Sequence, residues 1–172
     1  MKILKLLVFA TAVFTLSACG NDDDSTRDVE LTIENLAGTY ELTFYEDFYE
    51  LSETASNGSE VIIETEVCVG DTFTNALLIL NSDGTFTTSG NFREVCELTI
   101  NGDTTTEEEI VPFDSSGLFS ANDASNTITI NGNPNDVDLF DGNRLYLTST
   151  EVFTFDDETE RIETELRFEK IN

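Results

Sequence analysis

The chain has 172 residues, of which 35 are acidic and 8 basic, so its formal net charge at pH 7 is −27. Such a charge repels nucleic acid, because binding to phosphates depends on clustered Lys and Arg. The chain contains no histidine, which excludes Ser-His-Asp and Cys-His catalysis and histidine-ligated metal sites.

The first residues have the layout of a secretory signal peptide. Lys2 and Lys5 form a short positive region, and the apolar stretch that follows is too short to span a bilayer, which needs about 20 apolar residues. Next, Leu16-Ser17-Ala18-Cys19 resembles the lipobox of bacterial lipoproteins. The resemblance implies cleavage after residue 18 and acylation of Cys19, which makes a stable membrane anchor when two or more acyl chains are attached. A plain cleavable signal peptide with an incidental Cys19 is the alternative.

Residues 19–30 are expected to form an acidic tether after the signal peptide of residues 1–18. The acidic run Asp22-Asp23-Asp24 resembles the surface-export signal of one group of Gram-negative lipoproteins. It implies an outer-membrane protein that faces the cell exterior, with the periplasmic face as the alternative. Removing Lys2 and Lys5 with the signal peptide changes the charge to 6 − 35 = −29, so lipid rather than protein surface is expected to hold the membrane.

Cys68 and Cys96 are the two cysteines that remain once Cys19 is assigned to lipid. An even number of cysteines outside the cytoplasm predicts one disulfide. Two free thiols are the alternative. A zinc site is not plausible, because no histidine exists to complete it.

Past residue 30 the sequence alternates with a period of two, which is typical of strands with one buried face. Residues 162–169 alternate Ile, Thr, Leu and Phe with Glu and Arg, and residues 39–44 alternate in the same way. Short turn sequences such as Asn81-Ser82-Asp83-Gly84 separate these segments. About eight to ten strands with short connections predict one all-β, antiparallel domain over residues 31–172. An up-and-down β-barrel is favoured, and a β-sandwich is the competing architecture.

Three segments resemble lipocalin-like domains of bacterial surface lipoproteins. Residues 36–42 (LAGTYEL) resemble their first strand, residues 78–86 (LILNSDGTF) a hairpin, and residues 166–171 (LRFEKI) the last strand. The resemblance implies a calycin-type barrel in which a late basic side chain covers an aromatic ring at one end. Tyr40 stands where the family has Trp, so Arg167 or Lys170 is expected to close the barrel over Tyr40 by a cation–π contact. Alternatively, Tyr40 is simply core and the basic residues are solvated.

Catalysis is not expected, and no catalytic residue or cofactor is assigned. The carboxylates Glu41, Glu97 and Glu163 fall on wet faces, and no strand shows a lone carboxylate on its apolar face, where a raised pKa would be needed. No metal site is assigned either. The segment from residue 136 fails as an EF-hand, because its fifth position is Phe140. A looser calcium loop of Asp136, Asp138 and Asp141 is the alternative to an Asp-rich turn.

The expected function is that of a monomeric surface lipoprotein that binds a small apolar ligand inside the barrel. The side chains expected to line such a cavity are Tyr40, Phe44, Phe86, Phe155 and Phe168. The alternative is an accessory module with a packed core that binds a protein or glycan partner, for which the aromatic segment 44–49 is the candidate patch.

Overall fold

A computed structural model describes residues 29–171, and the predicted signal peptide, Cys19 and the acidic run 22–24 lie outside them. The described part contains one short helix and nine strands, and every strand pair is antiparallel, which confirms the all-β prediction. The elements are α1 (Ile33–Leu36), β1 (Gly38–Thr54), β2 (Glu60–Leu80), β3 (Thr85–Ile100), β4 (Asp103–Pro112), β5 (Ser115–Asn122), β6 (Thr127–Ile130), β7 (Asn133–Phe140), β8 (Arg144–Phe155) and β9 (Glu158–Ile171). No helix within residues 29–171 has the length and apolar character required to cross a bilayer.

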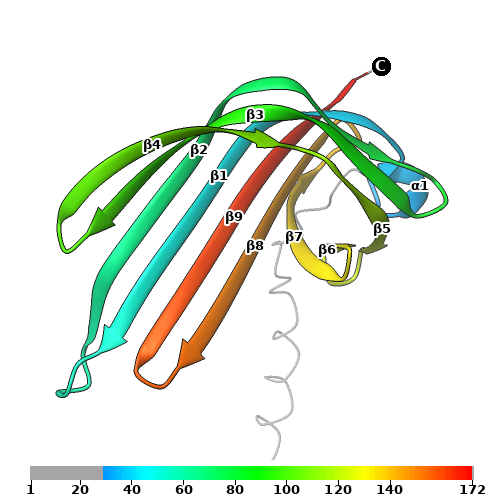
Figure 1. The fold of residues 1–172 in the computed structure, drawn as a ribbon. Helices are drawn as coiled ribbons and strands as arrows, with labels where there is room; N and C mark the ends of the chain where they lie inside the picture. Colours follow the sequence, from blue (N-terminus) through cyan, green and yellow to red (C-terminus); the bar gives the residue numbers. More distant parts are fainter. Residues whose placement is uncertain (1–28, 172) are drawn as a thin grey trace, which may run out of the picture.

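The strands form a closed ring of hydrogen-bonded neighbours. Their order is β2-β1-β9-β8-β7-β6-β5-β3, and the pairing of β2 with β3 completes the ring. Strands β4 and β5 share β3 as a neighbour: β5 pairs with residues 85–88 and β4 with residues 91–100. Figure 1 shows the short strands β5, β6 and β7 closing the ring beside α1.

Away from α1 the ring opens, because its strands differ in length. β2 has 21 residues and β6 only 4. Pairing of β7 with β8 ends at Thr148, so the rest of β8 pairs with β9 alone. The long strands therefore continue as a curved sheet in the order β4-β3-β2-β1-β9-β8, which runs to the lower left in Figure 1. We call this part the open half, and the rest of the ring the closed half.

The core fills the closed half. Its buried side chains come from alternate positions of the strands, as in Tyr40 and Leu42 of β1 or Leu145 and Leu147 of β8, each at most 1% exposed. Alternation places such residues on one face of a strand and their polar neighbours on the other. Helix α1 adds Leu36 to the core, and Thr32 caps it by accepting a hydrogen bond from the Asn35 amide (3.2 Å). This four-residue helix is too short for a helical period to reveal it in the sequence.

Cys68 and Cys96 form a disulfide, as predicted. The two residues lie directly opposite each other on β2 and β3, on the face that continues from the core. The bond therefore joins the two longest neighbouring strands at the beginning of the open half, where β5 to β7 no longer support the sheet.

Replacing both Cys68 and Cys96 by Ala should lower the free energy of unfolding by about 3–4 kcal/mol, because the unfolded chain regains the freedom that the closed loop removes. Urea unfolding of the oxidised protein measures this loss. Val69→Ala with Val95→Ala is the matched control, since these residues also face each other on β2 and β3 but without a bond. An equal loss in both double variants would contradict the prediction.

Candidate binding site

Tyr40 and Lys170 close one end of the ring. Lys170 Nζ lies 5.4 Å from the centroid of the Tyr40 ring, within cation–π range, and donates a hydrogen bond to the Ala37 carbonyl (2.9 Å). The Tyr40 hydroxyl donates to the Leu36 carbonyl (2.8 Å), and burial raises the pKa of Tyr40 to about 12. A Cβ on Gly38 would clash with the Lys170 side chain, so this contact requires glycine. Of the two basic residues expected near Tyr40, it is thus Lys170 that covers the ring.

Arg167 lies on the outer face of β9, the face turned away from the core. Its guanidinium carbon is 4.3 Å from the Phe44 ring centroid and 5.4 Å from that of Tyr146. Its Nε donates a hydrogen bond to Glu165 (2.5 Å), which raises the pKa of Arg167. Arg167 therefore links β1, β8 and β9 on the outside and does not contribute to closing the ring.

The five side chains expected to line a cavity do not surround a common space. Tyr40, Phe86 and Phe168 are at most 3% exposed and belong to the packed core, whereas Phe155 is 60% exposed at the β8–β9 hairpin. The expectation is wrong for Phe44, which lies on the outer face under Arg167. The register between β1 and β9 shifts between Leu42 and Phe44, and this bulge reverses which residues of β1 face the core.

Aromatic rings fill the space where the closed half meets the open half. Phe92 lies 4.7 Å from Tyr45, 5.9 Å from Phe73 and 6.5 Å from Phe113, measured between ring centroids, and Phe113 lies 6.4 Å from Phe168. These are ordinary packing distances for aromatic pairs. The entrance that a ligand would use from the open half is thus occupied by the protein's own rings.

Two hollows outside the core are lined by polar groups. One of about 430 Å³ lies at the tips of the β1 and β8–β9 strands, between Glu53, Phe155 and Glu158. The other, of about 210 Å³, lies along β9, where Phe48 is flanked by Glu46 and Glu163. Carboxylates line both hollows, so neither offers the dry walls that an apolar ligand requires.

The open half carries carboxylates on the face that continues from the core. Cross-strand register arranges this face in rows: Glu109, Glu94 and Gly70; Glu107, Cys96, Cys68, Asp47, Thr164 and Ser149; Thr105, Leu98, Glu66, Tyr49, Ile162 and Glu151; Asp103, Ile100, Glu64, Leu51, Glu160 and Phe153. The acidic face, as we call it, consists of the carboxylates in these rows: Asp47, Glu64, Glu66, Glu94, Asp103, Glu107, Glu109, Glu151 and Glu160. No Lys or Arg of residues 29–171 lies in the rows.

Glu94 is the most buried member of the acidic face, at 8% exposed. Burial raises the pKa of Glu94, the charges of Glu109, Asp47 and Glu66 raise it further, and a hydrogen bond from the Tyr45 hydroxyl opposes the change. Burial, followed by the charges of Asp47 and Glu94, also raises the pKa of Tyr45. Tyr45 therefore remains a neutral donor, and the face holds its carboxylates close enough to repel one another.

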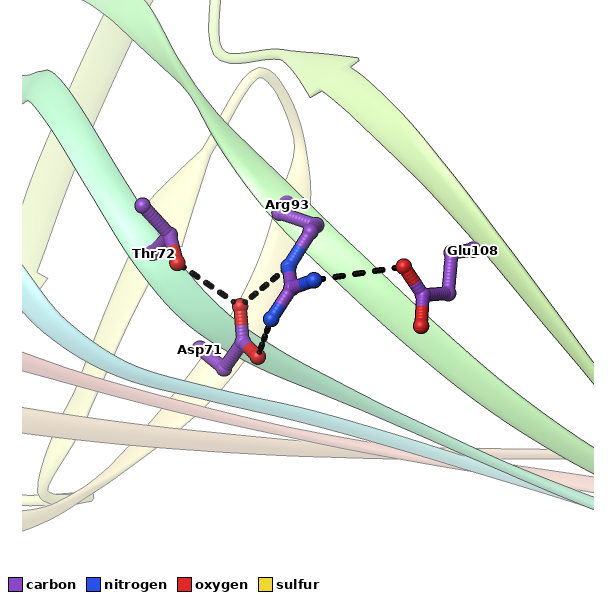
Figure 2. Close-up of polar contacts among 4 residues, drawn as sticks. All are labelled: Asp71, Thr72, Arg93 and Glu108. Carbon is purple, nitrogen blue, oxygen red and sulfur yellow. Dashed lines mark hydrogen bonds and ion pairs between the residues drawn. The ribbon is translucent and has the colours of Figure 1, made fainter.

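Arg93 lies on the outer face, between Phe92 and Glu94 in sequence, and its charge is already used. Figure 2 shows its guanidinium between Asp71 of β2 and Glu108 of β4. Arg93 Nε donates to Asp71 (2.8 Å) and Nη1 to Glu108 (3.2 Å), while the Thr72 hydroxyl also donates to Asp71 (2.9 Å). Hydrogen bonds from Arg93 hold the pKa of Asp71 below its usual range. This cluster ties β4 to β2 across β3.

The loop considered for calcium is organised as a turn. Asp141 accepts hydrogen bonds from the backbone amides of Asn143 (2.9 Å) and Arg144 (2.7 Å) and from Arg144 Nε (2.8 Å). Asp136 and Asp138 are exposed on β7. Among residues 29–171, potential metal-ligand atoms gather in one group, Glu66 with Cys68 and Cys96, whose sulfurs are bonded to each other.

No protein-family model matches the chain. No curated protein matches it either. Among solved structures, the chain is similar to the crystal structure of Ail, the attachment invasion locus protein of Yersinia pestis. The identity is 7%, the match covers 79% of this chain and 100% of Ail, and the TM-score is 0.25. A similarity at this level does not assign a function.

Sequence reasoning missed the acidic face. It placed the glutamates on wet faces and found no lone carboxylate on an apolar face, yet Glu94 lies between Phe92 and Cys96 on the core-side face of β3. The two-residue spacing of Phe92, Glu94 and Cys96 contained this signal. The charges on β4 gave none, because its residues are all polar up to Glu109.

Replacing Glu94 by Gln should stabilise the protein at pH 7 and not at pH 4. A carboxyl whose pKa is raised on folding disfavours the folded state once the pH exceeds its ordinary pKa, and this cost vanishes as the pH falls below that value. Thermal unfolding at both pH values is the measurement, and each 1 kcal/mol gained would raise the midpoint by about 2–4 °C. Exposed Glu41→Gln is the control and should show no such pH dependence. A lower midpoint for Glu94→Gln at pH 7 would show that the bond from Tyr45 outweighs burial.

Proposed function

We propose that the chain is an outer-membrane lipoprotein, anchored by lipid on Cys19 and facing the exterior, whose lipocalin-like barrel is a non-catalytic module that binds a partner through its surface. The observation that carries this proposal is the filled core: the aromatic rings from Tyr45 to Phe168 occupy the space that an apolar ligand would need. The binding of a small apolar ligand, expected first from the sequence, has no such support.

The closed ring supports a lipocalin-like barrel. Its neighbours number eight when β4 and β5 count as one position beside β3. A barrel of about this size is narrow enough for side chains to fill it. The Gly38-x-Tyr40 sequence and the cover that Lys170 provides match what the resemblance implies for the end of such a barrel.

The charge of the outer face supports an anchor outside the sheet. Along β9 this face carries Arg161, Glu163, Glu165 and Arg167. Strands that cross a bilayer carry apolar side chains toward the lipid, and a charged side chain there is destabilising. Lipid on Cys19 accounts for membrane attachment without requiring these strands to contact the bilayer.

The carboxylates of the acidic face support binding rather than catalysis. Like charges surround Glu94, and the chain has no histidine to act with it as a base or nucleophile partner. A concave surface of one charge instead attracts an oppositely charged partner and raises its rate of association.

Replacing Cys19 by Ala should abolish the incorporation of labelled fatty acid and move the protein from membranes to the soluble fraction. Cys68→Ala with Cys96→Ala is the control and should remain lipidated. Protease added to intact cells should degrade the wild-type protein. Asp22→Asn, Asp23→Asn and Asp24→Asn together should protect the protein by leaving it on the periplasmic face. Survival of the wild-type protein would refute outward display.

A neutral apolar fluorophore such as Nile red should show no saturable, stoichiometric binding to the native protein, because the rings around Phe92 leave it no dry space. Fluorescence titration at low micromolar concentrations tests this expectation. The protein unfolded partway in urea is the positive control, since it exposes apolar surface. One-to-one saturable binding to the native state would favour a ligand cavity over a surface module.

A further inference from the structure

We propose that the free edge of β4 binds a basic, extended segment of a partner protein by strand addition. The inference rests on the proposed surface-binding function, and it specifies where the partner binds and what chemistry it needs. In strand addition, main-chain hydrogen bonds provide affinity and alternate side chains provide specificity.

β4 presents an edge along its whole length. All its residues pair with β3, from Asp103 opposite Ile100 to Pro112 opposite Asn91, and within residues 29–171 no strand pairs with its other side. Such an edge is a template for another strand unless something blocks it. Proline is absent from β4 before its last residue, Pro112, so the backbone amides of residues 103–111 are available as donors.

The ion pairs around Arg93 hold this edge in place. Glu108 of β4 is bound by Arg93 of β3, which also binds Asp71 of β2 (Figure 2). The disulfide joins β2 and β3 in the row of Glu107. A partner strand would therefore meet a prepared edge and would not have to order it first, which lowers the cost of binding.

The charge of β4 selects the partner. Asp103, Glu107 and Glu109 belong to the acidic face, and β4 contains no basic residue. A second copy of the chain would place carboxylates opposite carboxylates, which is destabilising, so self-association is not the use of this edge. The other free edge, residues 149–155 of β8, carries a single carboxylate, Glu151, and lacks the same selectivity.

The register predicts a pattern in the partner strand. An added antiparallel strand extends the rows of the acidic face, so its residues opposite Glu109, Glu107 and Asp103 should be Lys or Arg. On the outer face, Ile110 is 63% exposed and should meet an apolar side chain. The probe that follows from this register is the peptide Val-Lys-Thr-Lys-Thr-Val-Thr-Lys, with its first residue opposite Ile110.

The test measures binding of this peptide, fluorescently labelled, to the full-length protein in detergent at low ionic strength. Fluorescence anisotropy should show saturable binding, and hydrogen exchange should slow at the amides of residues 103–112. The same peptide with methylated backbone amides keeps its charge but cannot pair, and should bind about tenfold more weakly. This comparison uses only wild-type protein, so it does not depend on the folding of a variant.

Charge is tested separately by Glu107→Gln with Glu109→Gln, which should weaken binding of the unmodified peptide about fivefold. Glu41→Gln with Glu169→Gln removes the same charge from exposed, paired positions of β1 and β9 and should leave the affinity unchanged. Equal binding of the methylated peptide, or unchanged exchange in β4, would overturn the proposal. If these results accompany surface display and no uptake of the apolar fluorophore, strand addition fails while the proposed function stands.

Discussion

The unequal lengths of the strands determine what this protein exposes. A ring of strands closes only where every position is filled, and β6 and β7, with 4 and 8 residues, fill theirs in the closed half alone. β1, β2 and β3 have 17, 21 and 16 residues and continue past that point. Their extension must end in unpaired edges, and within residues 29–171 these are β4 and the far part of β8.

An extension of this kind needs cross-links, because it has lost half of its supporting ring. The disulfide, the ion pairs of Arg93 and the contact between Tyr45 and Phe92 each join different strands near the boundary of the two halves. Buried apolar area there is limited, since Ile62, Ile100 and other apolar side chains of the open half are exposed. The stability of the open half therefore depends on a few specific bonds more than on its burial of apolar surface.

The sequence allowed the antiparallel strands, the turns and the disulfide to be predicted, because alternation, Gly-containing turns and an even cysteine count are local signals. It did not allow Phe44 to be placed correctly, since the bulge in β1 depends on how β1 meets β9. The acidic face was missed for a different reason. Its rows combine residues from six strands, and only the register, which a local pattern does not contain, brings Glu107 into line with Asp47.

The same charge that protects the free edges also limits what can use them. Most proteins block an edge strand with Lys, Pro or a bulge, and such a block acts against every partner. Carboxylates along β4 act only against acidic strands, including a second copy of this chain, whose net charge is −27. Repulsion of the wrong partners and attraction of a basic one come from the same side chains, which is how an interface gains specificity without additional contacts. The cost is internal: burial and the neighbouring carboxylates raise the pKa of Glu94, so the folded protein is less stable than it would be with an uncharged side chain there.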